Sequence, residues 1–217
     1  MKKILIFAIM LVLIGSMVAL ESEPSEVVGY VKYSCVIGSN LIALPMDAGY
    51  TTSATVGDDV TDADQMAYWN ADSQGWISSG KNFLGNWLSP FTVDDGMALM
   101  ARVTSDSDFF VAGAMYETEP TYSIVVGSNT IMVPLSKTEL TTSALVGDDM
   151  VNVDQMTYWN SDSQGWISSG KNFLGNWLSP FSTDIAMPMM TRATEAFTWP
   201  AAPVENIKAN KRNNTKR

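Results

Sequence analysis

A repeat of twenty identical residues constrains this chain more than any other feature of its sequence. Residues 72–91 read DSQGWISSGKNFLGNWLSPF, and residues 162–181 repeat this segment letter for letter. The segment therefore recurs after 90 residues (162 minus 72). Because a pattern that recurs at a fixed period indicates a repeated structural unit, we expect two copies of one fold in tandem.

The N-terminus has the layout of a secretory signal peptide. Lys2 and Lys3 precede an apolar run over 4–20, and an acidic stretch follows. Such a run is short for a membrane span and typical of a signal sequence. We expect cleavage after Ala19, which removes residues 1–19. The mature protein would then be secreted, periplasmic or on the cell surface, and would no longer contact a membrane. The alternative is an uncleaved N-terminal anchor.

The rest of the chain divides into two repeat domains and a tail. We place the first repeat domain at 27–108, the second at 109–200, and a basic, disordered tail at 201–217. These lengths suit two small domains better than one large enzyme with a deep cleft. Cys35 is the only cysteine, so no disulfide framework is expected, and we predict that Cys35 is a small buried core residue.

The local patterns predict a mainly β fold, with α+β as the alternative. Each domain should be an antiparallel β-rich unit with one short helix. In the first copy Ile42 and Leu44 should face the core, and the segment 51–57 should be a helix capped by Thr52 or Ser53 and ended by Gly57.

Three further strands follow from the pattern. A final strand over 97–103 should close the first copy, and Pro188 in its counterpart indicates an edge strand or a bulge. The apolar segment 109–115 is expected to pair into the second copy.

Turn residues at 71–74 predict a hairpin between 65–70 and 76–79. Its register would pair Trp69 with Trp76 and Tyr68 with Ile77. Met66, Tyr68 and Ile77 would then face the core, while the tryptophans share the opposite face with small and polar neighbours.

The tryptophan face is our candidate ligand-binding surface. It should bind a glycan or an extracellular protein through stacking on indole rings. The alternative is that the same face closes an interface between the copies. The predicted binding residues are Trp69, Trp76, Trp159 and Trp166.

The charge of the chain selects among possible partners. The formal net charge is −10, and five basic residues lie in the tail, so the body is strongly acidic. Such a body repels nucleic acid and anionic membranes, and it suits divalent cations, neutral glycans or protein surfaces.

Clustered aspartates in each copy are a candidate calcium site, although their spacing is not that of an EF-hand. The alternative is that these carboxylates are solvated turn residues. These residues are Asp58, Asp59, Asp64, Asp148, Asp149 and Asp154.

Enzymatic activity is not indicated by the sequence. The chain contains no histidine, the commonest general base and zinc ligand. Residues 75–81 fit the phosphate-loop spacing G-x-x-x-x-G-K, but neither the Ser or Thr that would hold magnesium nor a helix follows. A hydrolase that uses aspartates remains the alternative.

Three short motifs stand out: Asn40-Leu-Ile-Ala-Leu-Pro45, then W-N-x-x-x-Q-x-W over 69–76, and a closing Gly96-Met-Ala-Leu, where Ala186 replaces Gly96 in the second copy. Together they resemble a poorly characterised tandem repeat of secreted bacterial surface proteins. The resemblance implies a β-rich module of extracellular or adhesive proteins. We therefore expect a non-catalytic surface module for binding or adhesion, with a purely structural envelope spacer as the alternative.

Overall fold

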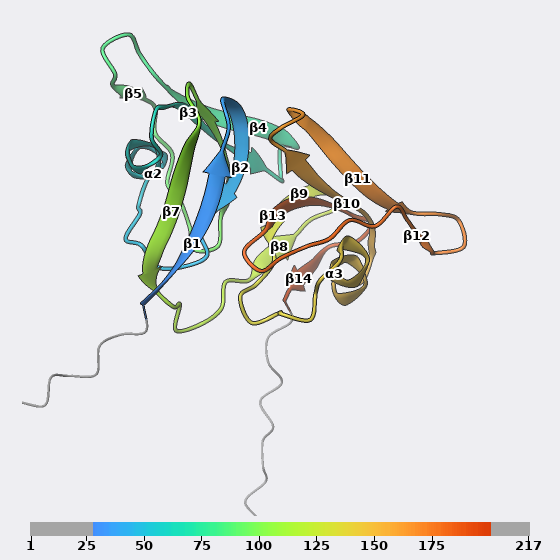
Figure 1. Ribbon diagram of the computed structural model, residues 1–217. Coiled ribbons are helices and arrows are strands. Elements are labelled where there is room, and N and C mark those ends of the chain that lie inside the picture. Colours follow the sequence, from blue (N-terminus) through green and yellow to red (C-terminus); the bar gives the residue numbers. More distant parts are fainter. Residues whose placement is uncertain (1–27, 201–217) are drawn as a thin grey trace, which may run out of the picture.

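A computed structural model describes residues 28–200 of the protein. It is mainly β, with 49% strand and 8% helix, as the sequence predicted. Each repeat contains a five-stranded antiparallel sheet, a two-stranded antiparallel sheet and one short helix (Figure 1). The predicted signal peptide (1–19) and basic tail (201–217) lie outside the described residues.

The first repeat has a large sheet of strand order β2-β6-β3-β4-β5 and a small sheet of β1 and β7. The elements are β1 (Val28–Cys35), β2 (Gly38–Ala43), α2 (Ser53–Asp59), β3 (Ala63–Asn70), β4 (Gly75–Lys81), β5 (Trp87–Leu88), β6 (Ala98–Val103) and β7 (Ser107–Ala114).

The second repeat has the same order, β9-β13-β10-β11-β12, with a small sheet of β8 and β14. Its elements are β8 (Tyr122–Ile124), β9 (Gly127–Met132), α3 (Ser143–Asp149), β10 (Val153–Asn160), β11 (Gly165–Lys171), β12 (Trp177–Leu178), β13 (Pro188–Ala193) and β14 (Phe197–Trp199).

Strand β7 belongs to the first repeat, so the expected pairing of 109–115 with the second copy is wrong. It runs antiparallel to β1, from Val28 opposite Ala114 to Cys35 opposite Ser107. Its alternate residues Phe109 and Val111 are buried in the first core, which explains the pairing. The boundary predicted between 108 and 109 therefore falls inside a strand.

Helix α2 begins where the sequence predicted but ends later. Thr52 is the N-cap, and its side chain accepts a hydrogen bond from the backbone N–H of Thr55. The helix continues past Gly57 to Asp59, so Gly57 is not a stop signal. A side chain at Gly57 would collide with the indole of Trp87. The glycine therefore makes room for Trp87 rather than ending the helix.

The residues that alternate along β2 are buried on both faces. Ile42 and the following Leu44 lie in the first core as predicted. Ala43 is also buried, in a small cluster with Met132 and Ala186 of the second repeat. The strand is therefore covered on one side by its own repeat and on the other by its partner.

Two further expectations are settled by the sheets. Cys35 is buried and free, and burial raises the pKa of its thiol to about 11. Pro188 is the first residue of β13, which lies between β10 and β9. It pairs with Met132 of β9, whereas the pairing of β13 with β10 covers only Met190–Ala193. Pro188 therefore lies at a local edge of the sheet, as expected, which is a position that proline tolerates.

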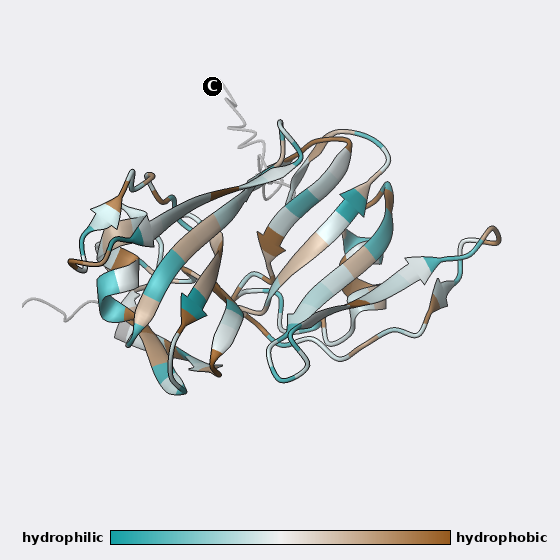
Figure 2. Ribbon diagram, turned by 90° about the horizontal axis from the view of Figure 1, so that it is seen from above, coloured by the Kyte–Doolittle hydropathy of each residue, from teal (hydrophilic) through white to brown (hydrophobic). Residues whose placement is uncertain are grey.

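The two repeats pack against each other, and polar and apolar residues alternate along the strands of each sheet (Figure 2). Contacts across the junction join β2 to β10 and β13, and reciprocally β9 to β3 and β6. Among residues 28–200, no helix is long and apolar enough to span a membrane.

Candidate functional site

The hairpin that carries the repeated segment has the predicted register. Trp69 lies opposite Trp76 and Tyr68 opposite Ile77. The rings of Trp69 and Trp76 meet edge to face, with centroids 5.6 Å apart. The second hairpin repeats this arrangement, with 5.1 Å between Trp159 and Trp166.

The tryptophan face lies at the junction between the repeats. The indole N–H of Trp69 donates to the carbonyl of Ser128 at 2.8 Å, and that of Trp159 donates to the carbonyl of Ser39 at 2.7 Å. Trp76 stacks on Trp166 of the other hairpin, with centroids 6.5 Å apart. The pairs thus form one reciprocal aromatic cluster. Trp76 remains 39% exposed, so part of the cluster still faces solvent.

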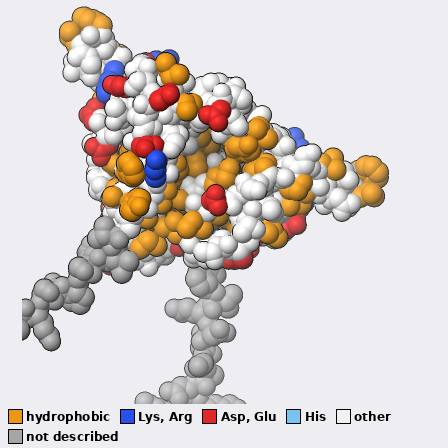
Figure 3. All heavy atoms as spheres, viewed as in Figure 1, with side chains coloured by type: hydrophobic (Ala, Val, Ile, Leu, Met, Phe, Trp, Pro, Cys, Tyr) orange, Lys and Arg blue, Asp and Glu red, His pale blue; other side chains and the backbone are white. Residues whose placement is uncertain are grey.

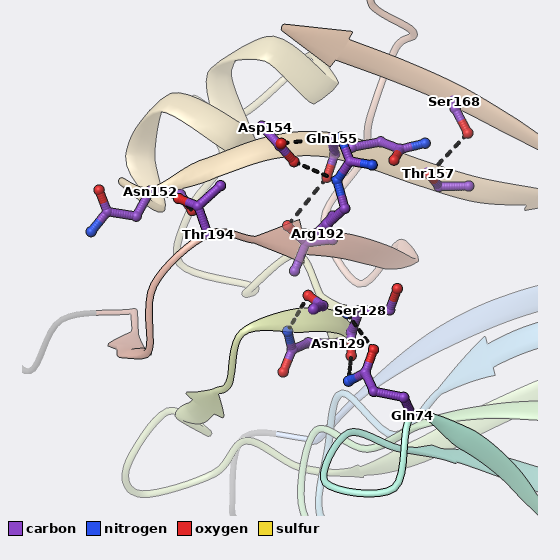
Figure 4. A network of polar contacts seen from close by, with 12 residues as sticks. Gln74, Ser128, Asn129, Asn152, Asp154, Gln155, Thr157, Ser168, Arg192 and Thr194 are labelled. Carbon is purple, nitrogen blue, oxygen red and sulfur yellow. Dashed lines mark hydrogen bonds and ion pairs between the residues drawn. The ribbon is translucent and has the colours of Figure 1, made fainter.

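Gln74 extends this junction, and sequence reasoning missed it. Its side-chain carbonyl accepts from the backbone N–H of Ser128 at 2.8 Å, and its amide nitrogen donates to the Ser128 carbonyl at 3.0 Å (Figure 4). Gln164 makes the same pair of bonds to Ser39. The identical glutamine in both turns was the available signal, but its bonding partner lies 54 residues away.

These contacts cap exposed sheet edges. Ser39 lies in β2 and Ser128 in β9, each the outermost strand of its sheet. An outer strand presents unpaired backbone groups that favour aggregation. Each hairpin supplies side-chain donors and acceptors for the edge of the other repeat. These bonds therefore fix how the two repeats dock. They also cover part of an outer strand that would favour aggregation in an isolated repeat.

Two tyrosines complete the reciprocal pattern. The hydroxyl of Tyr33 donates to the carbonyl of Ala186, and that of Tyr122 to the carbonyl of Gly96, both at 2.9 Å. Burial raises the pKa of both phenols above the ordinary range, so both are neutral donors at physiological pH. Every polar contact described so far has its counterpart with the repeats exchanged.

The face expected to be core is only partly buried. Met66 is buried, and Tyr68 packs against Phe91 with ring centroids 4.7 Å apart. Ile77, however, is 39% exposed, so its assignment to the core is wrong. Beyond β4 the sheet continues only with the two residues of β5, which leaves Ile77 without a cover.

The predicted calcium ligands of the first repeat do not converge. Asp58 accepts from the indole of Trp87 and lies 3.4 Å from the ammonium of Lys81. Asp59 accepts from a tyrosine hydroxyl, and Asp64 forms a two-pronged ion pair with Arg102.

The second repeat is similar. Asp148 bonds Trp177 and Lys171, Asp149 bonds Lys137 and Trp199, and Asp154 pairs with Arg192.

Within the described residues no three acidic, histidine or cysteine side chains lie close enough to share a metal ion. Calcium therefore stays a prediction. A bound ion would raise the melting temperature in millimolar calcium relative to chelator. Equal melting temperatures would contradict the prediction of a calcium site.

A groove of about 380 Å³ lies between the repeats. On the first repeat it is lined by Tyr68 and Trp69, by the turn after β3, and by the turn before β6; on the second by residues 121–125 and β9. Three carboxylates border it, and within residues 28–200 none of them forms an ion pair. They are Asp72, Asp94 and Asp95.

The groove breaks the symmetry of the repeats. Asp95 corresponds to Ile185, 90 residues later, and Thr130 corresponds to Leu41, 89 residues earlier. The equivalent position on the other side of the junction thus loses one carboxylate and one hydroxyl. Only one of the four predicted tryptophans, Trp69, lines the groove.

A second exposed feature is the loop between β4 and β5. Phe83 is 95% exposed, and Phe173 in the second copy has the same value. The hydrophobic side chains at both loop ends project from the body of the protein (Figure 3). Sequence reasoning did not identify this segment as a contact site.

The segment with the phosphate-loop spacing forms a strand and not a loop. Residues 75–81 form β4, and the ammonium of Lys81 lies over the ring of Trp87, 4.7 Å from its centroid.

Comparisons with protein-family models, curated proteins and solved structures found no match to this chain.

Proposed function

We propose that the protein is an exported, non-catalytic binding module of the cell surface, and that the groove between its repeats binds a neutral glycan. The observation that carries the proposal is the composition of that groove. Half-buried Trp69 lies beside carboxylates that form no ion pair with any residue in 28–200. Export is supported by the lysine-initiated apolar run at the N-terminus.

The chemistry of a neutral sugar matches these side chains. A sugar ring has an apolar C–H face, which can rest on an aromatic ring, and hydroxyl groups that donate to carboxylates. Hydrogen bonds to charged acceptors are stronger than neutral ones, by about a factor of two. The same carboxylates and the net charge of −10 repel anionic polymers. A neutral or weakly basic glycan is therefore the favoured ligand.

A second candidate function is a structural spacer of the envelope. The reciprocal bonds from Trp69 and Trp159 to the opposite repeat favour it, because they use the indole N–H groups that a ligand would otherwise engage. One protein can serve both functions, since a rigid junction also holds the groove open. Binding to a glycan is expected of the binding module and not of a pure spacer.

The test is a glycan array probed with the purified protein and two matched variants. Asp94→Asn changes the groove, whereas Asp184→Asn changes the equivalent position of the second repeat. We expect the protein to retain neutral oligosaccharides. Asp94→Asn should weaken retention about tenfold, the effect of losing a charged acceptor worth about 1.5 kcal/mol. Asp184→Asn should leave binding unchanged.

Two outcomes contradict the glycan proposal. One is that no neutral oligosaccharide is retained by the protein, which favours the spacer. The other is that both variants weaken binding equally, which places the ligand outside the groove.

A further inference from the structure

Each repeat presents an apolar loop tip to solvent. Phe83 and Phe173 are 95% exposed, and the neighbouring Leu84 and Leu174 are 69% exposed. The segment 82–91 contains no charged residue, and its copy is identical. Exposed apolar side chains that are grouped in this way indicate a contact surface.

The tip is built as a rigid loop. The side-chain oxygen of Asn82 accepts from the backbone N–H groups of Leu84 and Asn86, at 2.9 and 3.0 Å. The backbone of Asn82 exchanges two more bonds with Gly85 and Asn86, and Gly85 has the positive φ of 81° that this turn requires. Because the loop is ordered in advance, little conformational entropy is lost when it binds a partner.

The direction of the tips argues against one flat surface as the partner. The loop between β4 and β5 and the loop between β11 and β12 project from different sides of the molecule (Figures 1 and 3). A planar bilayer therefore does not receive both tips at once. The acidic body also disfavours an anionic membrane.

The chain itself carries a surface that fits such a tip. An apolar pocket of about 240 Å³ opens to solvent where the two repeats join. A cavity of about 150 Å³ lined by apolar side chains is large enough to bind benzene. The pocket therefore has room for a phenyl ring. Its apolar lining is Pro45, Met115, Tyr116, Pro120, Met132 and Leu135, and the polar residues Glu119 and Ser136 also line it.

We propose that the phenylalanine tip of one molecule inserts into this pocket of a second copy of the chain. The tip and the pocket are different surfaces, so the contact is heterologous and generates open-ended oligomers rather than a closed dimer. One aromatic side chain buries about 150–250 Å². This is far below the roughly 1,000 Å² of a stable interface, so each contact is weak and forms at high protein concentration.

Disulfide trapping tests the contact directly. One protein carries Leu84→Cys beside the intact Phe83, and a second carries Ser136→Cys at the rim of the pocket. Native Cys35 is buried and does not compete. We expect a mixed disulfide dimer under mild oxidation, and its loss when Phe83→Ser is added to the first protein. The matched control replaces Leu84→Cys by Ser73→Cys, in an exposed turn away from the tip.

The proposal is overturned by either of two results. The first is an equal yield of disulfide dimer from the Ser73→Cys control or from the Phe83→Ser variant. The second is binding of the protein to phosphatidylcholine vesicles that is lost in Phe83→Ser/Phe173→Ser, which assigns the tips to lipid. Neither result bears on the glycan groove, so the two proposals fail independently.

Discussion

Gly96 and Ala186 occupy the same turn in the two repeats, just before the last strand of each large sheet. Both have positive φ, 73° and 61°, a conformation that costs a residue with a side chain roughly 1–2 kcal/mol. A methyl group at Gly96 would also lie 2.7 Å from the Cβ of Pro120. The turn therefore tolerates alanine in the second repeat and not in the first.

We predict that Gly96→Ala lowers the free energy of unfolding by more than about 2 kcal/mol, because backbone strain and the collision with Pro120 add. The reverse change, Ala186→Gly, should alter it by less than about 1 kcal/mol, since relief of strain is offset by lost burial and greater chain entropy. Urea unfolding of both variants measures the difference. Equal effects at the two positions would contradict the role assigned to Pro120.

The lowered pKa of Asp148 predicts how its contribution to the stability of the protein changes with pH. Its hydrogen bond from Trp177, with a smaller contribution from Lys171, lowers the pKa of its carboxyl. A lowered pKa in the folded state stabilises the protein above the unfolded pKa, and this stabilisation is lost as the pH falls through the folded pKa. Asp148→Asn should therefore be slightly less stable than the native protein at pH 7. The difference should shrink below the ordinary value of 3.8 in thermal melts, and a constant difference would contradict it.

At the scale of elements, the hairpin was predictable and its surroundings were not. Turn residues at 71–74 fix the pairing of Trp69 with Trp76, because a hairpin register depends on local sequence. The partner of the Trp69 indole lies 59 residues away, on a strand that carries no signal for this contact. The sequence left open whether the tryptophan face binds a ligand or closes an interface between the copies, and the docking of the repeats places it at the interface.

Strand β7 is the clearest failure of local reasoning. The segment 109–115 has an apolar pattern that fits either repeat, and its position in the middle of the chain favoured the second. Its true partner, β1, lies at the beginning of the first repeat. The groove was equally out of reach, because it needs side chains from both repeats in one place.

The reciprocal junction predicts equal effects of equivalent changes. Trp69→Phe and Trp159→Phe each remove one indole hydrogen bond to the other repeat and keep the aromatic ring. Each should lower the free energy of unfolding by about 1 kcal/mol, the net contribution of one hydrogen bond. Urea unfolding of the two variants checks the symmetry. A large effect of one and none of the other would show that the junction is not reciprocal in solution.

At the scale of the whole molecule, the two repeats act as one unit. Each hairpin caps the outer strand of the other sheet, and buried residues of both repeats meet in a shared cluster of Ala43, Met132 and Ala186. The groove that we propose binds a glycan and the apolar pocket both lie between the repeats. We therefore expect binding to require the docked pair of repeats and not either copy alone.

Hydrogen–deuterium exchange of the protein, with and without an oligosaccharide retained on the array, tests this claim most directly. Binding in the groove should slow exchange in both repeats at once, at 70–72 and 94–97 of the first and at 121–125 of the second. The equivalent segments on the other side of the junction, 160–162 and 184–187, should be unaffected. Slowed exchange confined to one repeat, or equal on both sides of the junction, would contradict the account.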